Sequence, residues 1–355
     1  MTLWIVAVIA VLTIVFLLKS RDNYLELPEL PVEAGAETGD VTVVIPARNE
    51  AANIARAVES LRGVPIIVVD DESSDRTAEL ARKAGATVIS APKLPGGALG
   101  KPNACQAGAR VSHSDWILFT DADTCYRPEF LPSIMNYARS EKLDIVTVFL
   151  RQERGTLAEK LVLPYAAALY FAGVNEENVN SGRSQEALAN GQCMLFRRNT
   201  YDFLGGHAAV IGNVIEDVEF ASLAKRHRVR LRVLRAEGLG SVRMYGGLGG
   251  VWRGFQKNAF GFLMINKWSG FQVVLLSLLL TLWAPVIVWL VLCGWWKLAI
   301  LFGLVPPVLL WRWYGNPFTA LLSPIAIYFF QFIALSSVAA FVHGRGVKWK
   351  GRRVS

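Results

Sequence analysis

The chain has 355 residues, of which 53% are hydrophobic and 19% are charged, and its formal net charge is +8. A soluble domain usually carries about 25% charged residues, so apolar segments must accompany any folded domain. The four cysteines show no paired metal spacing and do not predict a disulfide framework in a chain of this length. Much of the positive charge lies beside apolar segments and accompanies no nucleic-acid motif. We therefore expect a membrane surface, and not nucleic acid, as the partner.

The first element is an apolar segment that we expect to anchor the chain. Residues 1–18 contain no charge, and Lys19 and Arg21 follow at once. A signal peptide would carry its charge before the apolar core and a small-residue cleavage site after it, and this segment has neither. We predict a transmembrane anchor over residues 1–20, with the chain from Lys19 onward in the cytoplasm by the positive-inside rule. Residues 21–40 are predicted to be a linker, because Pro, Glu and Gly are frequent there.

Strands and helices alternate over the next hundred residues. Short apolar runs rich in β-branched residues predict strands at Val41–Pro46, Pro65–Asp70, Ala86–Ser90, Trp116–Thr120 and Asp144–Phe149. Helical patterns lie between them at Ala51–Arg62, Asp75–Ala84, Lys101–Val111 and Pro128–Ser140. Such alternation predicts βαβ units and a parallel sheet.

The remaining apolar segments lie after this alternating region. We expect Leu157–Val174 to rest on the membrane or to be buried in the domain, and residues 246–268 to form an amphipathic interfacial segment. Residues 269–343 predict two or three transmembrane helices, because the uncharged run Leu298–Trp311 is short and contains two prolines. Three spans would place the basic tail, residues 344–355, outside the cell, and two would place it in the cytoplasm.

Polar residues follow three of the predicted strands at their carboxyl ends, where open α/β sheets bind ligands. The segment from Pro46 to Glu50 follows the first strand, and Asp70 and Asp71 follow the second, where carboxylates can accept hydrogen bonds from a nucleobase or a ribose. Asp75 is explained by helix capping. The fourth strand ends in Asp121-Ala122-Asp123. If this segment is extended, both carboxylates point the same way and can converge on Mg²⁺ or Mn²⁺, although a surface turn is the alternative.

The order and spacing of these motifs resemble family 2 glycosyltransferases with the GT-A fold, over Val41 to about Tyr245. The anchor placement is similar to that of the hopene-associated and carotenoid-type membrane members. The resemblance implies a Rossmann-like, mostly parallel α/β sheet with helices on both faces, a GT-A catalytic domain over residues 41–245, and transmembrane helices at both ends. It also implies that the donor nucleotide is held by Pro46, Ala47, Arg48, Asn49, Glu50, Asp70, Asp71 and Asp121.

The same resemblance assigns the remaining roles. Lys101, in Gly100-Lys101-Pro102-Asn103, would lie near the diphosphate, and Asp123, with Asp121, would bind the metal. The pair Glu216-Asp217 is similar to the catalytic pair of the family, whose Asp is the general base, although acids at a helix N-terminus are also stabilised by the dipole.

Four further residues are weaker candidates. Asn190-Gly191-Gln192 is similar to the wall that faces the donor sugar, which makes Gln192 a candidate contact. His207 either contacts substrate or is a structural histidine. Arg253 and Lys257 either neutralise diphosphate or contact lipid headgroups.

We therefore expect an inverting glycosyltransferase that moves one sugar from a nucleotide-diphosphate sugar to a membrane lipid, with Mg²⁺ or Mn²⁺, at the cytoplasmic face of the cell (inner) membrane. A processive polysaccharide synthase is the first alternative, but the Gln-x-x-Arg-Trp motif of processive members is absent from residues 251–258. A non-catalytic nucleotide- or lipid-binding membrane scaffold is the alternative from another class, because fold does not imply function.

Overall fold

A computed structural model describes residues 3–33, 38–96, 98–213, 215–265, 267–342, 347–349 and 352–354, with side chains of residues 257–269 and 340–355 outside the description. The chain divides into two compact units. The first comprises residues 1–26, 154–176 and 245–355, and the second comprises residues 27–153 and 177–244. Residues 154–176 thus group with the terminal helices, whereas we expected them in a domain over 41–245. The reason is that the helix Leu157–Ala172 within this segment is mostly apolar and buried and packs on other apolar helices.

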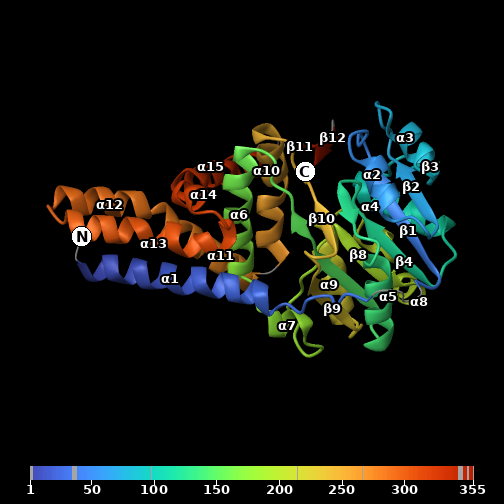
Figure 1. Ribbon diagram of the computed structural model, residues 1–355, viewed down its shortest axis with the longest axis horizontal. Coiled ribbons are helices and arrows are strands. Elements are labelled where there is room, and N and C mark those ends of the chain that lie inside the picture. Colours follow the sequence, from blue (N-terminus) through green and yellow to red (C-terminus); the bar gives the residue numbers. More distant parts are fainter. Residues whose placement is uncertain are drawn as a thin grey trace. The chain divides into compact units, whose positions relative to one another are not determined.

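The second unit contains a seven-stranded sheet with the order β3-β2-β1-β4-β8-β6-β9 (Figure 1). Its strands are β1 (Val41–Ala47), β2 (Ile66–Asp70), β3 (Thr87–Ser90), β4 (Trp116–Thr120), β6 (Ile145–Phe149), β8 (Cys193–Arg197) and β9 (Leu231–Arg235). Neighbouring strands are parallel except on the two sides of β8, which runs antiparallel to β4 and β6. The five predicted strands and the mostly parallel sheet are confirmed.

Helices cover both faces of this sheet (Figure 1). The four predicted helices are confirmed as α2 (Ile54–Ser60), α3 (Thr77–Lys83), α4 (Gly100–Val111) and α5 (Phe130–Ser140). On one face Phe130 and Ile134 of α5 share a core with Val43 of β1. On the other face α4 packs so closely that a Cβ at Gly108 would lie 2.3 Å from Val44 Cγ1. The later elements of the unit are α7 (Glu176–Asn180), α8 (Arg198–Phe203), the 3-10 helix η1 (Gly206–Val210) and α9 (Glu216–Arg226), with a small sheet of β5 (Thr124–Tyr126), β7 (Arg151–Gln152) and β10 (Gly240–Val242).

The predicted boundary between anchor and linker at residue 20 is wrong. Helix α1 (Leu3–Glu26) continues through Lys19 and Arg21 to Glu26. Polar residues of its last turns make contacts that favour the helix: Asn23 Nδ2 donates to Phe171 O at 2.8 Å, and the Tyr24 ring lies 4.8 Å from that of Phe171. A count of apolar residues stops at the first charge and therefore ends such a helix too early.

Residues that follow α1 are also ordered, although we expected a linker. Leu27 and Leu30 are buried, Leu30 N donates to Arg235 O, and Arg235 N donates to Pro28 O, both at 2.8 Å. Arg235 Nε further donates to Leu27 O at 3.0 Å. The segment therefore pairs with the last residue of β9, at the free edge of the sheet, and occupies main-chain groups that would otherwise be open to other chains.

The first unit is helical. It contains α1, α6 (Leu157–Ala172), α10 (Leu248–Ile265), α11 (Lys267–Thr281), α12 (Trp283–Leu292), α13 (Trp296–Tyr314), α14 (Pro317–Leu321) and α15 (Ser323–Val342), and a hairpin of β11 (Val347–Trp349) and β12 (Arg352–Val354). Figure 1 shows α1, α12 and α13 side by side, and α6 packs against α1 and α13. Within the described residues, three segments are long and apolar enough to cross a membrane: Leu3–Glu26, Gly270–Leu292 and Trp296–Tyr314.

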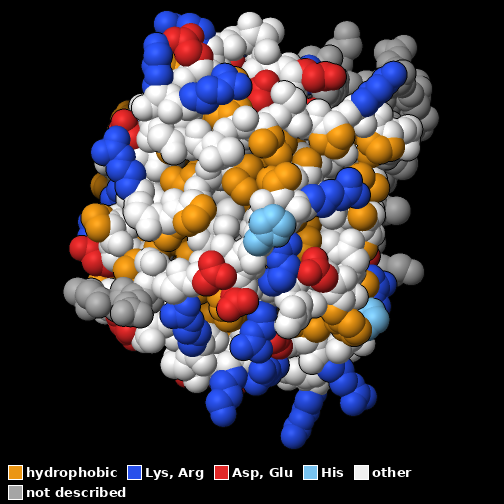
Figure 2. Space-filling view, turned by 90° about the vertical axis from the view of Figure 1, so that its right-hand side faces the viewer, with side chains coloured by type: hydrophobic (Ala, Val, Ile, Leu, Met, Phe, Trp, Pro, Cys, Tyr) orange, Lys and Arg blue, Asp and Glu red, His pale blue; other side chains and the backbone are white. Residues whose placement is uncertain are grey.

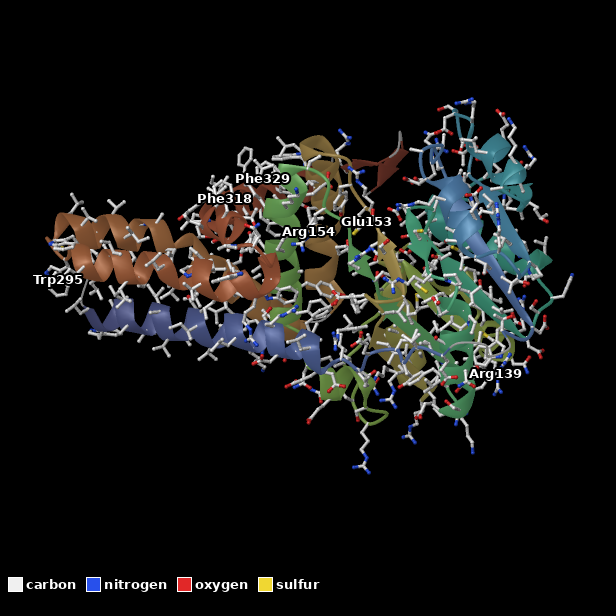
Figure 3. The ribbon with its side chains drawn as sticks, in the orientation of Figure 1. Arg139, Glu153, Arg154, Trp295, Phe318 and Phe329 are labelled. Atoms are coloured by element: carbon white, nitrogen blue, oxygen red, sulfur yellow. The ribbon has the colours of Figure 1, made fainter. Side chains whose placement is uncertain are left out.

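Helix α13 corrects the alternative in which the middle run, Leu298–Trp311, is too short to span. The helix includes the flanking Lys297 and Arg312 and has 19 residues, or about 28 Å, close to the ~30 Å hydrocarbon core of a bilayer. Trp295 lies at the turn before α13 (Figure 3), where an aromatic residue fits a membrane interface. The number of crossings and the side of the tail stay predictions, and the side chains of residues 344–355 lie outside the description.

The two segments that we expected at the membrane surface are both helices of the first unit. Helix α6 is largely buried: Tyr165 has no exposed surface, and the buried Glu159 accepts a hydrogen bond from Gly247 N at 2.8 Å. Residues 246–268 contain α10, and their position at an interface stays a prediction.

Candidate functional site

Loops that follow β1 and β2 form one side of the site. The register pairs Ala47 with Asp70, and Asp71 N donates to Ala47 O at 2.8 Å. Arg48 Nη1 donates to Asp71 O at 2.5 Å, so the side chain of the first loop holds the second loop in place. The predicted nucleotide residues of the two loops therefore lie together, as the parallel pairing requires.

Backbone strain is concentrated in the same loops. Asn49 and Glu72 have φ values of 55° and 56°, in the left-handed region that costs a non-glycine residue free energy. Asn49 offsets this cost by bonding across the gap: its N–H donates to Ser73 Oγ at 3.0 Å, and its Oδ1 accepts from Ser74 N at 2.8 Å. Strain that surrounding contacts maintain is typical of ligand-binding loops.

Two carboxylates in this region accept hydrogen bonds within the fold. A third carboxylate has an oxygen without a hydrogen-bond partner among the described residues. Asp75 accepts hydrogen bonds from Thr77 N at 3.0 Å and Ala51 N at 3.1 Å, which supports its role as a capping residue. The Glu50 carboxylate accepts from Asn53 Nδ2 at 2.9 Å. By contrast, Oδ1 of Asp70 is buried and has no hydrogen-bond partner among the described residues. A buried acceptor without a partner is costly, and a ligand N–H or O–H would satisfy it.

Lys101 connects three distant segments at the carboxyl edge of the sheet. It lies in the first turn of α4, and its Nζ is 2.8 Å from Asp121 Oδ1, 3.1 Å from Glu216 Oε1 and 3.1 Å from Gly191 O. Burial lowers the pKa of Lys101, but the carboxylates of Asp121 and Glu216 outweigh burial and raise this pKa well above the ordinary lysine value. The ammonium group is therefore a fixed positive charge where a diphosphate is expected to bind.

The expectation of an extended Asp121-Ala122-Asp123 segment is wrong. The chain turns there: Thr124 Oγ1 donates to Asp121 O at 2.8 Å, and Thr124 N lies 3.4 Å from the same oxygen. The two carboxylates consequently do not follow the alternation of a strand, and that of Asp121 pairs with Lys101. Within the described part of the chain, no three His, Cys, Asp or Glu residues gather closely enough to hold a metal on their own. The carboxylates of Asp121 and Asp123 fit Mg²⁺ or Mn²⁺, because these ions often take one or two carboxylates and complete their coordination shell with substrate phosphates.

Asp217 has the environment of a proton acceptor. Its Oδ2 accepts a hydrogen bond from Gly191 N at 2.7 Å, and its Oδ1 accepts one from Val218 N at 2.9 Å. Burial and the adjacent Glu216 raise the pKa of Asp217 to about 6, while Lys101 and the two N–H groups limit the rise. The carboxylate is thus ionised at neutral pH and is a stronger base than an ordinary aspartate.

His207 is a structural histidine in this arrangement. Its Nδ1 lies 2.9 Å from the Tyr201 hydroxyl, and its ring packs against Phe119 at 4.5 Å and Phe220 at 5.0 Å. Burial and the charge of Lys101 lower the pKa of His207 to about 3, so the imidazole is neutral. The small cavity beside it, which Pro46, Asp121 and Glu216 also line, measures about 10 Å³ and has room for one water molecule but not for a sugar.

The remaining predicted residues are Gln192, which follows Gly191 and accepts a hydrogen bond from Asp121 N at its main-chain oxygen, and two basic residues of the first unit. Gln192 is buried, and its Oε1 already accepts from Asn190 Nδ2 at 3.1 Å and Gln152 Nε2 at 3.3 Å. Arg253 is exposed on α10 of the first unit, and the side chain of Lys257 lies outside the description. The roles proposed for Arg253 and Lys257 therefore stay predictions.

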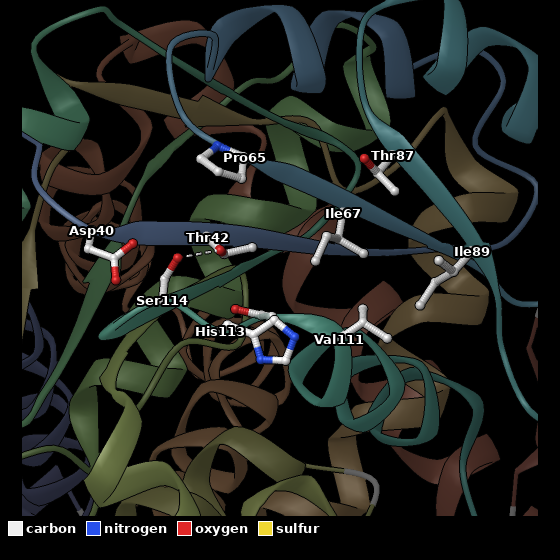
Figure 4. A pocket seen from close by; sticks show the side chains of 10 residues that line it. Asp40, Thr42, Pro65, Ile67, Thr87, Ile89, Val111, His113 and Ser114 are labelled. Carbon is white, nitrogen blue, oxygen red and sulfur yellow. Dashed lines mark hydrogen bonds between the residues drawn. The ribbon is translucent and has the colours of Figure 1, made fainter.

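A larger cavity, of about 470 Å³, lies at the opposite ends of the strands (Figure 4). Thr42, Ile67 and Thr87 line it from the beginnings of β1, β2 and β3, and the Thr42 hydroxyl is hydrogen bonded to that of Ser114 at 2.7 Å. None of the predicted site residues lines this cavity. The outer surface of the second unit carries interspersed acidic and basic side chains with apolar ones between them (Figure 2).

Comparison with known proteins shows which family has a domain similar to the one that carries these polar residues. Residues 42–205 match the model of the family described as "Glycosyl transferase family 2". This part of the chain is therefore similar to a family 2 glycosyltransferase domain. A 4,4'-diaponeurosporenoate glycosyltransferase of Staphylococcus haemolyticus is 30% identical to it over 219 residues, which cover 59% of this chain and 58% of the relative. The enzyme of the same name from Staphylococcus aureus is 28% identical over 225 residues, or 58% and 56%. The chain thus matches little more than half the length of these relatives, and the expected resemblance to carotenoid-type members is confirmed.

The fold of the family 2 domain also has a solved counterpart. A mannosyltransferase from Pyrobaculum calidifontis, solved with GDP-Man and Mn²⁺, is similar with a TM-score of 0.58 and 14% identity, over 97% of this chain and 98% of that one. At this identity the similarity concerns the fold, and it confirms the expected GT-A architecture with helices at both ends.

The sequence motifs did not predict the role of Gly191, whose main chain contacts both Lys101 and Asp217. The antiparallel pairing of β8 with β4 places Cys193 opposite Thr120, and this brings Gly191 to the edge where Asp121 lies. A glycine between two polar residues before an apolar run was the available signal, and it does not distinguish a main-chain contact from an ordinary turn.

Proposed function

We propose that this chain is a membrane-anchored, inverting glycosyltransferase that transfers one sugar from a nucleotide-diphosphate donor to a membrane lipid. The observation that carries the proposal is the meeting of Lys101, Asp121, Glu216 and Asp217 at the carboxyl edge of a family 2 domain. A fixed cation next to a basic carboxylate is what displacement of a diphosphate by a hydroxyl requires.

The donor nucleotide binds in the loops after β1 and β2. The unsatisfied Oδ1 of Asp70 accepts a donor N–H or O–H, and Arg48 keeps the loop that contains Asp71 in place. Lys101 contacts the diphosphate and exchanges part of its contact with Asp121 and Glu216 for the phosphate oxygens. Asp123, with Asp121, would hold Mg²⁺ or Mn²⁺, and the ion would supply positive charge that stabilises the leaving diphosphate. The Pyrobaculum enzyme of similar fold was solved with Mn²⁺, which supports a divalent ion at this kind of site.

Transfer requires one proton acceptor. The acceptor hydroxyl gives its proton to the carboxylate of Asp217 as its oxygen forms a bond to the anomeric carbon. The bond from that carbon to the phosphate oxygen breaks, and its electron pair leaves with the nucleoside diphosphate. Because attack and departure occur on opposite sides of the sugar, the configuration inverts.

A lipid acceptor explains the remainder of the chain. Three segments have spanning length and composition, and the Staphylococcus relatives are named for diaponeurosporenoate, an apolar carotenoid acid. An enzyme whose acceptor is dissolved in the bilayer benefits from such an anchor. We place the protein in the cell (inner) membrane with the second unit in the cytoplasm, where nucleotide sugars are made.

The test uses the full chain in detergent or nanodiscs, with Mn²⁺ or Mg²⁺, a panel of nucleotide sugars and a bacterial lipid extract, read by mass spectrometry. We expect a lipid that carries one added sugar, and we expect Asp217→Asn and Asp123→Ala to abolish it. Asp202→Asn is the matched control, because this exposed carboxylate lies on α8 and only faces Arg198 at 3.9 Å. Equal activity of Asp217→Asn and Asp202→Asn would refute the mechanism, and long polymeric products would favour a processive synthase.

A further inference from the structure

The turn Asn190–Gly191–Gln192 contacts both charged groups of the proposed site through its main chain. Gly191 N–H donates to Asp217 Oδ2 at 2.7 Å, and Gly191 C=O accepts from Lys101 Nζ at 3.1 Å. One residue thus faces the proposed base with a donor and the proposed diphosphate-binding ammonium with an acceptor. Its two polar groups match the charges of their partners.

Space, and not backbone conformation, favours glycine at this position. A Cβ on Gly191 would lie 3.1 Å from Asp217 Oδ2 and 3.1 Å from Lys101 Nζ, which is closer than ordinary contacts. The φ of Gly191 is not in the left-handed region that favours glycine. A side chain here would therefore push apart the carboxylate and the ammonium that the main chain now holds together.

The turn is fixed from behind by strand β6. Thr147 Oγ1 accepts from Asn190 N at 2.9 Å and donates to Asn190 O at 3.1 Å. The Asn190 side chain adds bonds from Nδ2 to Val148 O at 3.2 Å and from Gln192 N to its Oδ1 at 3.3 Å. Thr147 has no exposed surface, and its hydroxyl contacts the turn through these two hydrogen bonds.

We propose that Thr147 and Asn190 are positioning residues, which hold the Gly191 main chain so that it orients the carboxylate of Asp217 toward the acceptor hydroxyl. This inference rests on the proposed function, in which Asp217 is the base. The N–H of Gly191 is a preorganised dipole aimed at one carboxylate oxygen, and such dipoles are effective because they need not reorganise during the reaction.

The other charged groups around Asp217 are Glu216 and Lys101, and none of them depends on Thr147 for its position through a hydrogen bond in the described part of the chain. Glu216 of α9 and Lys101 of α4 face it directly, and Asp121 and His207 face Lys101. None of these side chains is hydrogen bonded to Thr147 in the described part of the chain. Replacement of Thr147 therefore changes the Gly191 contact without removing a charge.

The experiment compares Thr147→Val with Thr42→Val in the full chain. Both threonines are buried strand residues whose hydroxyl groups are hydrogen bonded, but Thr42 pairs with Ser114 at the opposite ends of the strands. We expect Thr147→Val to lower kcat at pH 7 by about 10- to 100-fold, to leave the donor KM within about twofold, and to shift the acidic midpoint of the kcat profile upward. Thr42→Val should lower the thermal midpoint by a similar amount and change neither kcat nor the pH profile.

Three outcomes are distinguishable. If Thr147→Val and Thr42→Val have the same kcat and the same pH midpoint, the positioning role is refuted. If Asp217→Asn retains the activity of the parent chain, the proposed base is refuted, whatever Thr147→Val does. If Thr147→Val does not fold, Asn190→Ser, which leaves the Thr147 hydroxyl in place and removes the amide bond to Val148 O, provides the same kinetic comparison.

Discussion

Removing the negative charge of Asp217 is expected to abolish activity and to stabilise the fold at the same time. Burial and Glu216 raise the pKa of this carboxyl from 3.8 to about 6, because the folded protein favours its neutral form. A group with a raised pKa contributes stability below its unfolded value, near pH 4, and loses that contribution as the pH rises through about 6. At pH 7 the ionised Asp217 consequently opposes folding.

The size of this effect can be worked from the contacts. The difference between 3.8 and about 6 corresponds to about 3 kcal/mol. Asp217→Asn regains part of it, but the asparagine has one acceptor for the two N–H groups of Gly191 and Val218, and loss of one such bond costs about 1 kcal/mol. Asp217 is also half-buried and not fully enclosed, so solvent screening reduces the gain further. A net stabilisation of about 1 kcal/mol at pH 7 remains.

The assay is a thermal or chemical unfolding series in detergent from pH 4 to pH 8, beside the rate of sugar transfer. We expect Asp217→Asn to raise the unfolding midpoint at pH 7 and 8, to match the parent near pH 4, and to transfer no sugar. For the parent chain, kcat/KM should fall about tenfold between pH 7 and pH 5, because the ionised fraction of a group with a pKa of about 6 falls by that factor. A rate that is flat over this range, or an asparagine variant that is less stable at every pH, would refute the reasoning.

Three other perturbations follow from particular contacts. Lys101→Met removes a charge that lowers the pKa of Asp217, so the acidic midpoint of the rate profile should move upward and the rate at pH 7 should fall at least tenfold, as a pH–rate series would measure. Gly108→Ala should destabilise the protein by about 1–3 kcal/mol in an unfolding titration, because its Cβ would overlap a side chain of β1, whereas Gly238→Ala, with nothing within 4 Å, should stay within about 0.5 kcal/mol of the parent. Asp75→Ala removes a partly exposed cap whose pKa is lowered by hydrogen bonds that outweigh its burial; it should cost about 0.5–1 kcal/mol at pH 7, and the difference from the parent should shrink as the pH falls below about 4.

Much of the fold could be predicted from the sequence because its signals are local. The run Trp116–Thr120 is apolar and β-branched or aromatic, and Lys101–Val111 has helical periodicity, so both were found within a residue of their observed bounds. The ends of the long apolar helices were predicted less well, since a charge such as Lys297 ends an apolar run without ending a helix. In the site, Asp70, Lys101 and Asp217 are candidates from motifs alone, whereas the sequence leaves the conformation at Asp121 open between an extended segment and a turn.

The contact between Gly191 and Asp217 shows why the other contacts of the site could not be predicted from the sequence. It depends on the antiparallel insertion of β8 between β4 and β6, which is a property of the sheet order and not of any local pattern. A main-chain hydrogen bond also does not depend on the residue type, except that a small side chain is favoured here. Lys101 was expected to bind diphosphate, but its bridging of Asp121 and Glu216 required the three-dimensional arrangement.

The segment that lies along β9 also sets an order of events during synthesis. Leu27 leaves the ribosome early, and its partner Arg235 is made 208 residues later. Until then one border of the nascent sheet has nothing to pair with, although the membrane helix before it has already been made. Contacts of such long range slow folding and leave strands exposed to aggregation while the chain grows. The second unit therefore joins its first residues to a strand that is made near its end, and a fragment that stops before Arg235 lacks this pairing.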